Sequence, residues 1–169
     1  MAKSPAEKPV AGTRDADCSL SMTRRFAAPR EAVFAAWTDP AAIARWIGPR
    51  SIKAEVKAMT AKPGGSYRIA MHGANGSIMN VSGTYREVVP PERLVFTWAW
   101  ERFSPSGQKE EEQDETLVTV EFHERGTWTE VVLTHELFQT AEQRDRHSVG
   151  WNGCFDVLAR ALESTQEST

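Results

Sequence analysis

Hydrophobic and polar residues alternate with a period of two along most of the chain between residues 18 and 135. In LVFTWAWE, residues 94–101, the large apolar side chains occupy every second position. Because successive side chains of a strand point to opposite faces, this pattern predicts strands that turn one face toward a core. Seven segments follow it: 18–26, 51–59, 64–72, 77–89, 94–101, 116–123 and 127–135. Gly83, inside the long fourth segment, predicts a bulge or bend.

Residues 28–49, APREAVFAAWTDPAAIARWIGP, interrupt the alternation with helical spacing. Pro29 and Pro40 each suit the start of a helix, and Asp39 is a suitable N-cap for the second one. The stretch therefore predicts two short helices directly after the first strand, the second ending at Gly48-Pro49.

A longer helix is expected over residues 140–164. Thr140, followed three residues later by Gln143, resembles a capping box. Helical spacing gathers a mostly apolar stripe on one face; its members are His147, Trp151, Cys154, Phe155, Leu158 and Leu162. We expect the second half of this stripe to pack as core and the first half to close one end of a cavity.

This order of elements predicts an α+β fold. Short turns between successive strands favour one antiparallel sheet of about six to seven strands. A long amphipathic C-terminal helix is the natural cover for its apolar face. Since a straight helix cannot fill a strongly curved sheet along its whole length, a cavity between the two is expected.

Three segments are expected to lie outside this regular structure. Residues 102–114, RFSPSGQKEEEQD, are polar and acidic and predict a mobile hairpin loop. Residues 1–17 and 165–169 are expected to be disordered tails, which leaves a single domain over residues 18–164.

Composition narrows the functional classes. The 169 residues are 40% hydrophobic and 25% charged, with a net charge of −3. No basic surface for nucleic acid is indicated, and no apolar run approaches the roughly 20 residues that span a bilayer. The start of the chain has no apolar signal segment, so a cytoplasmic protein with its two cysteines reduced is expected.

Several stretches resemble the START-like superfamily of helix-grip proteins, which includes Bet v-like folds. They include RRFAAPREAVFAAWTDPAAIARWIGP, GGSYRIAMHG, GTYREVVPPERLVFTW and GWNGCFDVLARAL. Within the superfamily they resemble a bacterial family related to the C-terminal domain of the heat-shock-protein-90 ATPase activator. The resemblance implies a helix-grip fold with a deep apolar cavity between the sheet and the C-terminal helix, entered near the short helices. The activator itself carries a separate N-terminal domain, for which this sequence has only a short segment.

The cavity wall is expected to combine aromatic residues of the sheet and the last helix with two histidines. The candidates are Trp46, Tyr67, Met71, Phe96, Trp98, Trp100, His135, Phe138, His147, Trp151 and Phe155. The alternative for the aromatic residues is plain core packing, and for His135 and His147 a hydrogen-bonded position at the rim. Arg24 could reach the cavity as an anion anchor or lie at an exposed strand end.

The sequence gives little support for a catalytic site or a metal site. No histidine or cysteine spacing typical of a metal site occurs, so neither a metal nor another cofactor is expected. Cys154, among apolar neighbours, is expected to be an unreactive thiol.

Three functions follow in order of preference. The first is binding of a small hydrophobic or aromatic molecule. The second is interaction with a chaperone or another protein, with the acidic segment 102–114 as the candidate surface. The third is a cyclase- or hydrolase-like activity using the cavity histidines. Exposed strands or the short helices could also support a homodimer.

Overall fold

The computed structural model describes residues 18–48 and 52–167, and within them an eight-stranded antiparallel sheet holds a long helix. Each of the seven predicted segments coincides with a strand to within two residues at either end. The expected α+β helix-grip architecture is confirmed. The strands are Ser19–Phe26 (β1), Lys53–Met59 (β2), Ser66–His72 (β3), Ile78–Val89 (β4), Arg93–Phe103 (β5), Lys109–Glu112 (β6), Thr116–Arg125 (β7) and Trp128–Glu136 (β8). The predicted tail 1–17, Pro49 of the predicted helix stop and Ser51 of the second segment lie outside the described residues.

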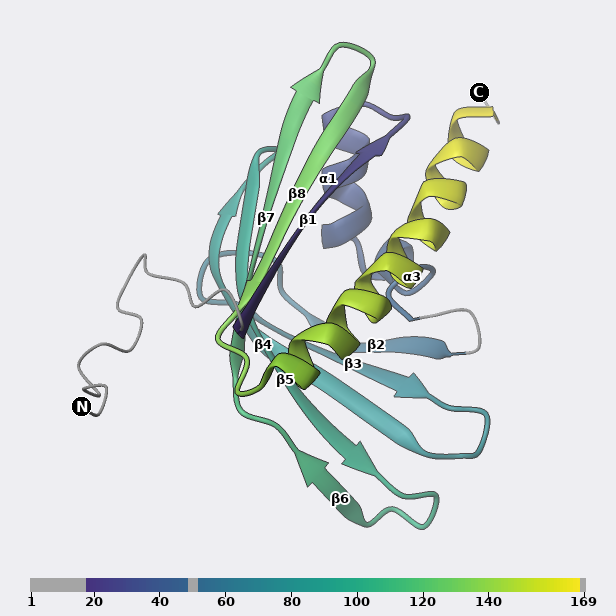
Figure 1. Cartoon of the computed structure of the whole chain (residues 1–169). Coiled ribbons are helices and arrows are strands. Elements are labelled where there is room, and N and C mark those ends of the chain that lie inside the picture. The colour runs from purple at the N-terminus through teal and green to yellow at the C-terminus, as the bar shows by residue number, and fades with distance from the viewer. Residues whose placement is uncertain (1–17, 49–51, 168–169) are drawn as a thin grey trace, which may run out of the picture.

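The strands follow the order β1-β8-β7-β5-β4-β3-β2, with β6 paired to the far end of β5. They fan from the steep β1, β7 and β8 to the shallow β2 and β3, and the helix crosses the concave side of the sheet (Figure 1). The fan of strands is the accumulated twist of a sheet. It leaves the first turns of the helix opposite β3, β4 and β5 (Figure 1).

In the part of the chain that the structure describes, three helices accompany the sheet: Arg30–Thr38 (α1), Pro40–Ile43 (α2) and Ala141–Glu167 (α3). Asp39 caps α2 as predicted, because its carboxylate accepts from the backbone N–H of Ala42 at 3.1 Å. At the start of α3, the Thr140 hydroxyl accepts from the Gln143 N–H at 3.1 Å. The α3 helix continues to Glu167, three residues beyond the predicted end.

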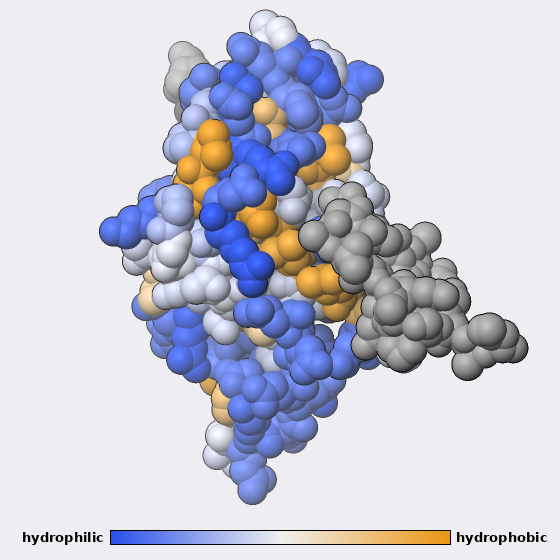
Figure 2. Space-filling model, turned by 90° about the vertical axis from the view of Figure 1, so that its left-hand side faces the viewer, coloured by the Kyte–Doolittle hydropathy of each residue, from blue (hydrophilic) through white to orange (hydrophobic). Residues whose placement is uncertain are grey.

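Residues 102–114 form a hairpin, as predicted, but the expectation that it is all loop is wrong, because it contains strand β6 paired with β5. Strand β5 runs on to Phe103, and β6 pairs with it through a turn in which the Ser104 N–H donates to the Gln108 carbonyl at 2.8 Å. Lys109 lies 3.0 Å from Glu101 and 3.3 Å from Glu112. These contacts explain the order, because alternating charges compensate one another across the hairpin. In Figure 2 the lower end of the molecule is mainly hydrophilic, whereas hydrophobic residues gather in the middle of the same face.

Gly83 permits a very close approach of β4 to β5. A Cβ atom added there would lie 2.0 Å from the Thr97 carbonyl oxygen. The neighbouring Thr84 N–H donates to the Thr97 hydroxyl at 2.8 Å, so a side chain replaces part of the ladder. The predicted irregularity is therefore present, with the register shift two residues further on, between Tyr85 and Glu87.

Helix α3 buries its predicted stripe against the sheet and α1. Trp151, Phe155 and Leu158 are all at most 3% exposed. Phe155 meets Phe26 edge-on, at 5.7 Å between ring centroids. This packing fills the half of the fold near α1. No helix in the described residues has the length and apolarity needed to cross a membrane.

Candidate functional site

A pocket of about 440 Å³ lies between the first half of α3 and the ends of β3, β4 and β5. We call it the main pocket. Its apolar lining consists of Ile47, Ile52, Met71, Met79, Trp98, Trp100, Trp151 and Cys154. Its volume falls within the range of about 300–1,000 Å³ that is typical of small-molecule sites. The cavity expected between the sheet and the C-terminal helix is therefore present.

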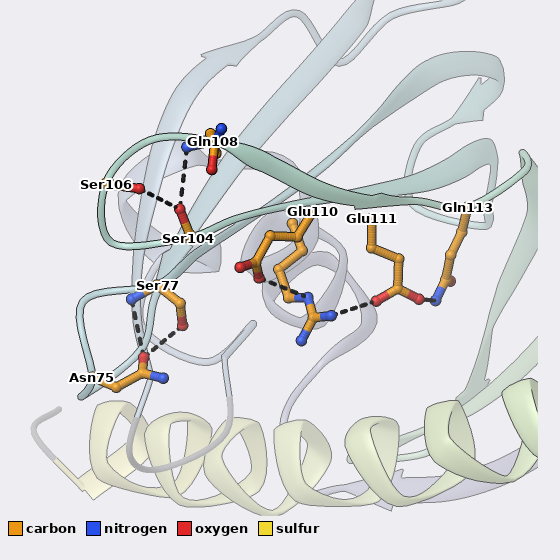
Figure 3. A network of polar contacts seen from close by, with 9 residues as sticks. Asn75, Ser77, Ser104, Ser106, Gln108, Glu110, Glu111 and Gln113 are labelled. Atoms are coloured by element: carbon orange, nitrogen blue, oxygen red, sulfur yellow. Dashed lines mark hydrogen bonds and ion pairs between the residues drawn. The ribbon is translucent and has the colours of Figure 1, made fainter.

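Polar groups from two hairpins and the helix surround this apolar lining. They are Gly73, Ser77, Arg102, Glu111, Gln113, Arg146, His147 and Gly150. Figure 3 shows Glu110 and Glu111 reaching toward one guanidinium, which is that of Arg102, at 3.9 and 3.0 Å. The Gln113 amide donates to the other oxygen of Glu111 at 3.4 Å. The pocket thus combines an apolar interior with a hydrogen-bonded polar rim.

Five of the eleven residues predicted for the cavity wall line the main pocket. They are Met71, Trp98, Trp100, His147 and Trp151. The other six lie elsewhere, and the reason in each case is that other side chains cover them.

Trp46 and Phe155 belong to the closed core between α1, α2 and α3. Trp46 is 1% exposed, packs edge-on against Trp37 at 4.7 Å and donates its Nε1–H to the Ala36 carbonyl at 2.9 Å. Phe155 is fully buried among Phe26 and Trp37. Neither ring has a free face for a ligand.

Tyr67 and Phe96 lie deeper along the strands, where rings fill the space. They meet edge-on at 5.7 Å and share a residual space of about 20 Å³. Tyr67 also borders a more open hollow of about 600 Å³, whose lining includes the polar side chains of Arg68 and Glu101. The Tyr67 hydroxyl donates to the Thr97 carbonyl at 2.5 Å, and burial raises the Tyr67 pKa well above its ordinary value. The residual space of about 20 Å³ holds at most one water molecule.

His135 is a fully buried, neutral member of a hydrogen-bond chain. Its Nδ1 accepts from the Trp151 Nε1–H at 3.0 Å, so its proton is on Nε2 and is donated to the Thr116 hydroxyl at 2.7 Å. That hydroxyl in turn donates to the Trp98 carbonyl at 2.9 Å. Burial, and secondarily the nearby His147, lowers the pKa of His135 well below 6.5. Phe138 covers the imidazole at 4.3 Å between centroids, so neither residue reaches the pocket surface.

His147 is held in the same way at the pocket wall. Its Nδ1–H donates to the Gln143 carbonyl at 2.8 Å, and its Nε2 accepts from the Trp100 Nε1–H at 2.8 Å. Burial lowers its pKa, and Arg146 adds to the effect. Both ring nitrogens of each histidine are therefore engaged within the protein. In this arrangement they orient two pocket-wall indoles and have no nitrogen available to exchange a proton with a ligand.

Two further sequence predictions concern Cys154 and Arg24. The Cys154 thiol donates to the Ile47 carbonyl at 2.8 Å, and burial raises its pKa to about 12, so the prediction of an unreactive thiol is supported. Arg24 does not enter the pocket. It pairs with Asp156 at 3.0 Å on the outer side of α3. Within residues 18–48 and 52–167, no cluster of His, Cys, Asp and Glu side chains is suited to a metal ion.

Most of the polar rim was not predicted from the sequence, although part of it follows the same periodicity as the predicted wall. Arg102 continues the every-second-residue series of Trp98 and Trp100 by one more step. Arg146 and Gly150 precede Cys154 at intervals of four residues and so share its helix face. Extending both periodicities to the ends of their elements would have found these residues.

Comparisons with known proteins agree with this architecture. A protein of Chromobacterium violaceum is 24% identical, with a TM-score of 0.75 over 86% of this chain and 98% of that one. A Rhodobacter sphaeroides protein is 23% identical, with a TM-score of 0.73 over 88% and 95% of the two chains. An AHSA1 protein of Silicibacter pomeroyi is 26% identical, with a TM-score of 0.74 over 87% and 99%.

No match was found among curated proteins. The family model described as "Activator of Hsp90 ATPase homolog 1-like protein" matches residues 27–163, which is most of the chain. The expected relationship to START-like helix-grip proteins is confirmed, and the chain belongs to the family of activator of Hsp90 ATPase homolog 1-like proteins.

Proposed function

We propose that the protein binds a small hydrophobic or aromatic molecule in the main pocket. The observation that carries this proposal is the apolar volume of about 440 Å³, walled by Trp98, Trp100 and Trp151. Burial of apolar ligand surface contributes about 25 cal/mol per Å² before the costs of association. The wall is also held in place before a ligand arrives, because two of the three indoles are hydrogen-bonded to histidines.

The size of the pocket limits the ligand. At about 30 Å³ per water molecule, it has room for roughly fifteen waters. A compound of one or two fused or linked aromatic rings, or a medium-length alkyl chain, matches that volume. A complete two-chain lipid does not.

Gly150 offers a direct test because it lines the pocket from α3 and an added Cβ there meets no atom within 4 Å. Gly150→Leu places an apolar side chain into the pocket and also favours the helix. Gly153→Leu is the matched control, since Gly153 is on the same helix with equally open space but does not line the pocket.

The assay is the fluorescence titration of the uncharged dye N-phenyl-1-naphthylamine, with circular dichroism to confirm that each variant is folded. We expect the native protein and Gly153→Leu to bind the dye, and Gly150→Leu to bind at least about tenfold more weakly, a difference of 1.4 kcal/mol. Absence of binding to the native protein, or equal binding to Gly150→Leu, would contradict the proposal.

The family match supports a second candidate, stimulation of a chaperone ATPase. It is tested by the rate of ATP hydrolysis of purified Hsp90 with increasing amounts of the protein. A saturable rise in the rate would support it, and an unchanged rate would reject it. The acidic hairpin is a weaker candidate surface than the sequence indicated, because Arg102 and Lys109 pair with its glutamates.

A further inference from the structure

The charged side chains that line the main pocket are not all ion-paired. Arg102 and Arg146 line it together with one carboxylate, that of Glu111. Glu111 lies 3.0 Å from the Arg102 guanidinium, and Glu110 lies 3.9 Å from it on the same hairpin. Arg102 is therefore ion-paired within the β5–β6 hairpin, which leaves one positive charge without an ion-pair partner among the described residues that line the pocket.

That remaining charge is Arg146. Its side chain is exposed, and among the residues that the structure describes no carboxylate lies within ion-pair distance of it. The neighbouring His147 does not pair with Arg146, since both of its ring nitrogens are hydrogen-bonded to other groups of the protein. A guanidinium has five N–H donors in a planar fork that matches an anionic oxygen group.

We propose that the ligand of the main pocket is a monoanionic amphipath, with its aromatic body between Trp98, Trp100 and Trp151 and its anionic group at Arg146. This inference rests on the proposed function and adds the charge and orientation of the ligand. Flat indole faces favour an aromatic body. Arg146 is the cation at the rim without an ion-pair partner among the described residues, so this position favours an anionic group over a neutral or cationic one.

The test uses two dyes with the same ring system. N-phenyl-1-naphthylamine is uncharged, and 8-anilinonaphthalene-1-sulfonate adds a single sulfonate to it. Both are titrated by fluorescence against the native protein, Arg146→Gln and the control Arg160→Gln. Arg160 is exposed on the same helix and does not line the pocket.

We expect Arg146→Gln to weaken the affinity for the sulfonate dye by about tenfold at low salt, which is the effect of losing one charge-assisted contact. The affinity for the neutral dye should change by less than about twofold. Added salt should reduce the difference, because the contact is exposed to solvent. Arg160→Gln should change neither affinity.

The inference is overturned if Arg146→Gln leaves the affinity for the sulfonate dye unchanged, or if it weakens both dyes equally. The latter result would mean that Arg146 supports the shape of the pocket instead of contacting an anion. In both cases binding of the neutral dye and its loss in Gly150→Leu would leave the proposed function intact. Failure of the native protein to bind the neutral dye would remove the proposed function itself.

Discussion

Acidification should destabilise the fold through the buried His135 and the half-buried His147. In the folded protein His135 accepts a hydrogen bond from Trp151, and His147 accepts one from Trp100. A protonated ring cannot accept either bond, and protonation would place a charge beside the other imidazole and Arg146. Burial is the main reason that the pKa of each histidine lies below 6.5 in the folded chain, and the nearby charge adds to it.

The sign and size of the effect follow from proton linkage. Below pH 6.5 the folded chain binds fewer protons at these two histidines than the unfolded chain does, so the free energy of unfolding falls as the pH falls. Between pH 7.5 and 5.5 one histidine that stays neutral in the folded state contributes a loss of about 1.4 kcal/mol. His135 should contribute this full amount, and His147 at most the same. The native protein should therefore lose between about 1.4 and 2.8 kcal/mol from these two groups.

The assay is urea unfolding followed by far-ultraviolet circular dichroism at pH 7.5 and 5.5. His147→Gln should lose less stability on acidification than the native protein, by up to about 1.4 kcal/mol. The control is His123→Gln, because the native His123 side chain is 40% exposed and lies 3.5 Å from Glu121 at the surface. If the native protein and His147→Gln lose the same stability between the two pH values, the assignment of a neutral, hydrogen-bond-accepting His147 is wrong.

Four further predictions concern backbone and thiol chemistry. Gly83→Ala should destabilise the protein by about 2 kcal/mol or more in urea unfolding, because its Cβ would lie 2.0 Å from the Thr97 carbonyl oxygen. Gly153→Ala should instead stabilise α3 by about 0.5–1 kcal/mol, and a loss of stability would contradict the open space at that position. Leu137→Gly should raise the melting temperature, since Leu137 is 54% exposed with a φ of 76° that glycine adopts without strain; an unchanged or lower value would argue against strain there. Cys154 should stay unmodified by a thiol reagent in the native protein and react after unfolding, and rapid native-state labelling at Cys154 would show that its shielding is incomplete.

The fold could be predicted because its main elements bury alternating or helically spaced apolar residues. Strand β6 could not be found in this way, because its sequence is Lys-Glu-Glu-Glu and all four residues are exposed. Its order comes from pairing with β5 and from ion pairs with Arg102 and Glu101, which depend on a partner strand. Sequence patterns report which face of a segment is buried, and a strand without a buried face gives no such signal.

The pocket could be predicted only in outline, because periodicity gives the face of a strand and not the depth along it. On β3, Tyr67 and Met71 both point toward α3, and only Met71 lines the main pocket. On β5, Phe96 faces the same way as Trp98 and Trp100 but is covered by Tyr67 and Tyr85. The division between filled core and open pocket depends on where α3 crosses the sheet, which no local pattern contains.

His135 and His147 each join the sheet to helix α3 through hydrogen bonds. The Trp98 carbonyl, Thr116, His135 and Trp151 form a continuous hydrogen-bond chain from β5 through β7 and β8 to α3. A second link joins Trp100 of β5 to α3 through His147. Both chains fix α3 relative to the sheet, and they end on indoles that line the pocket. The pocket is thus kept open by the same contacts that attach the helix, so a ligand need not order its walls on binding, and the entropic cost of association is correspondingly lower.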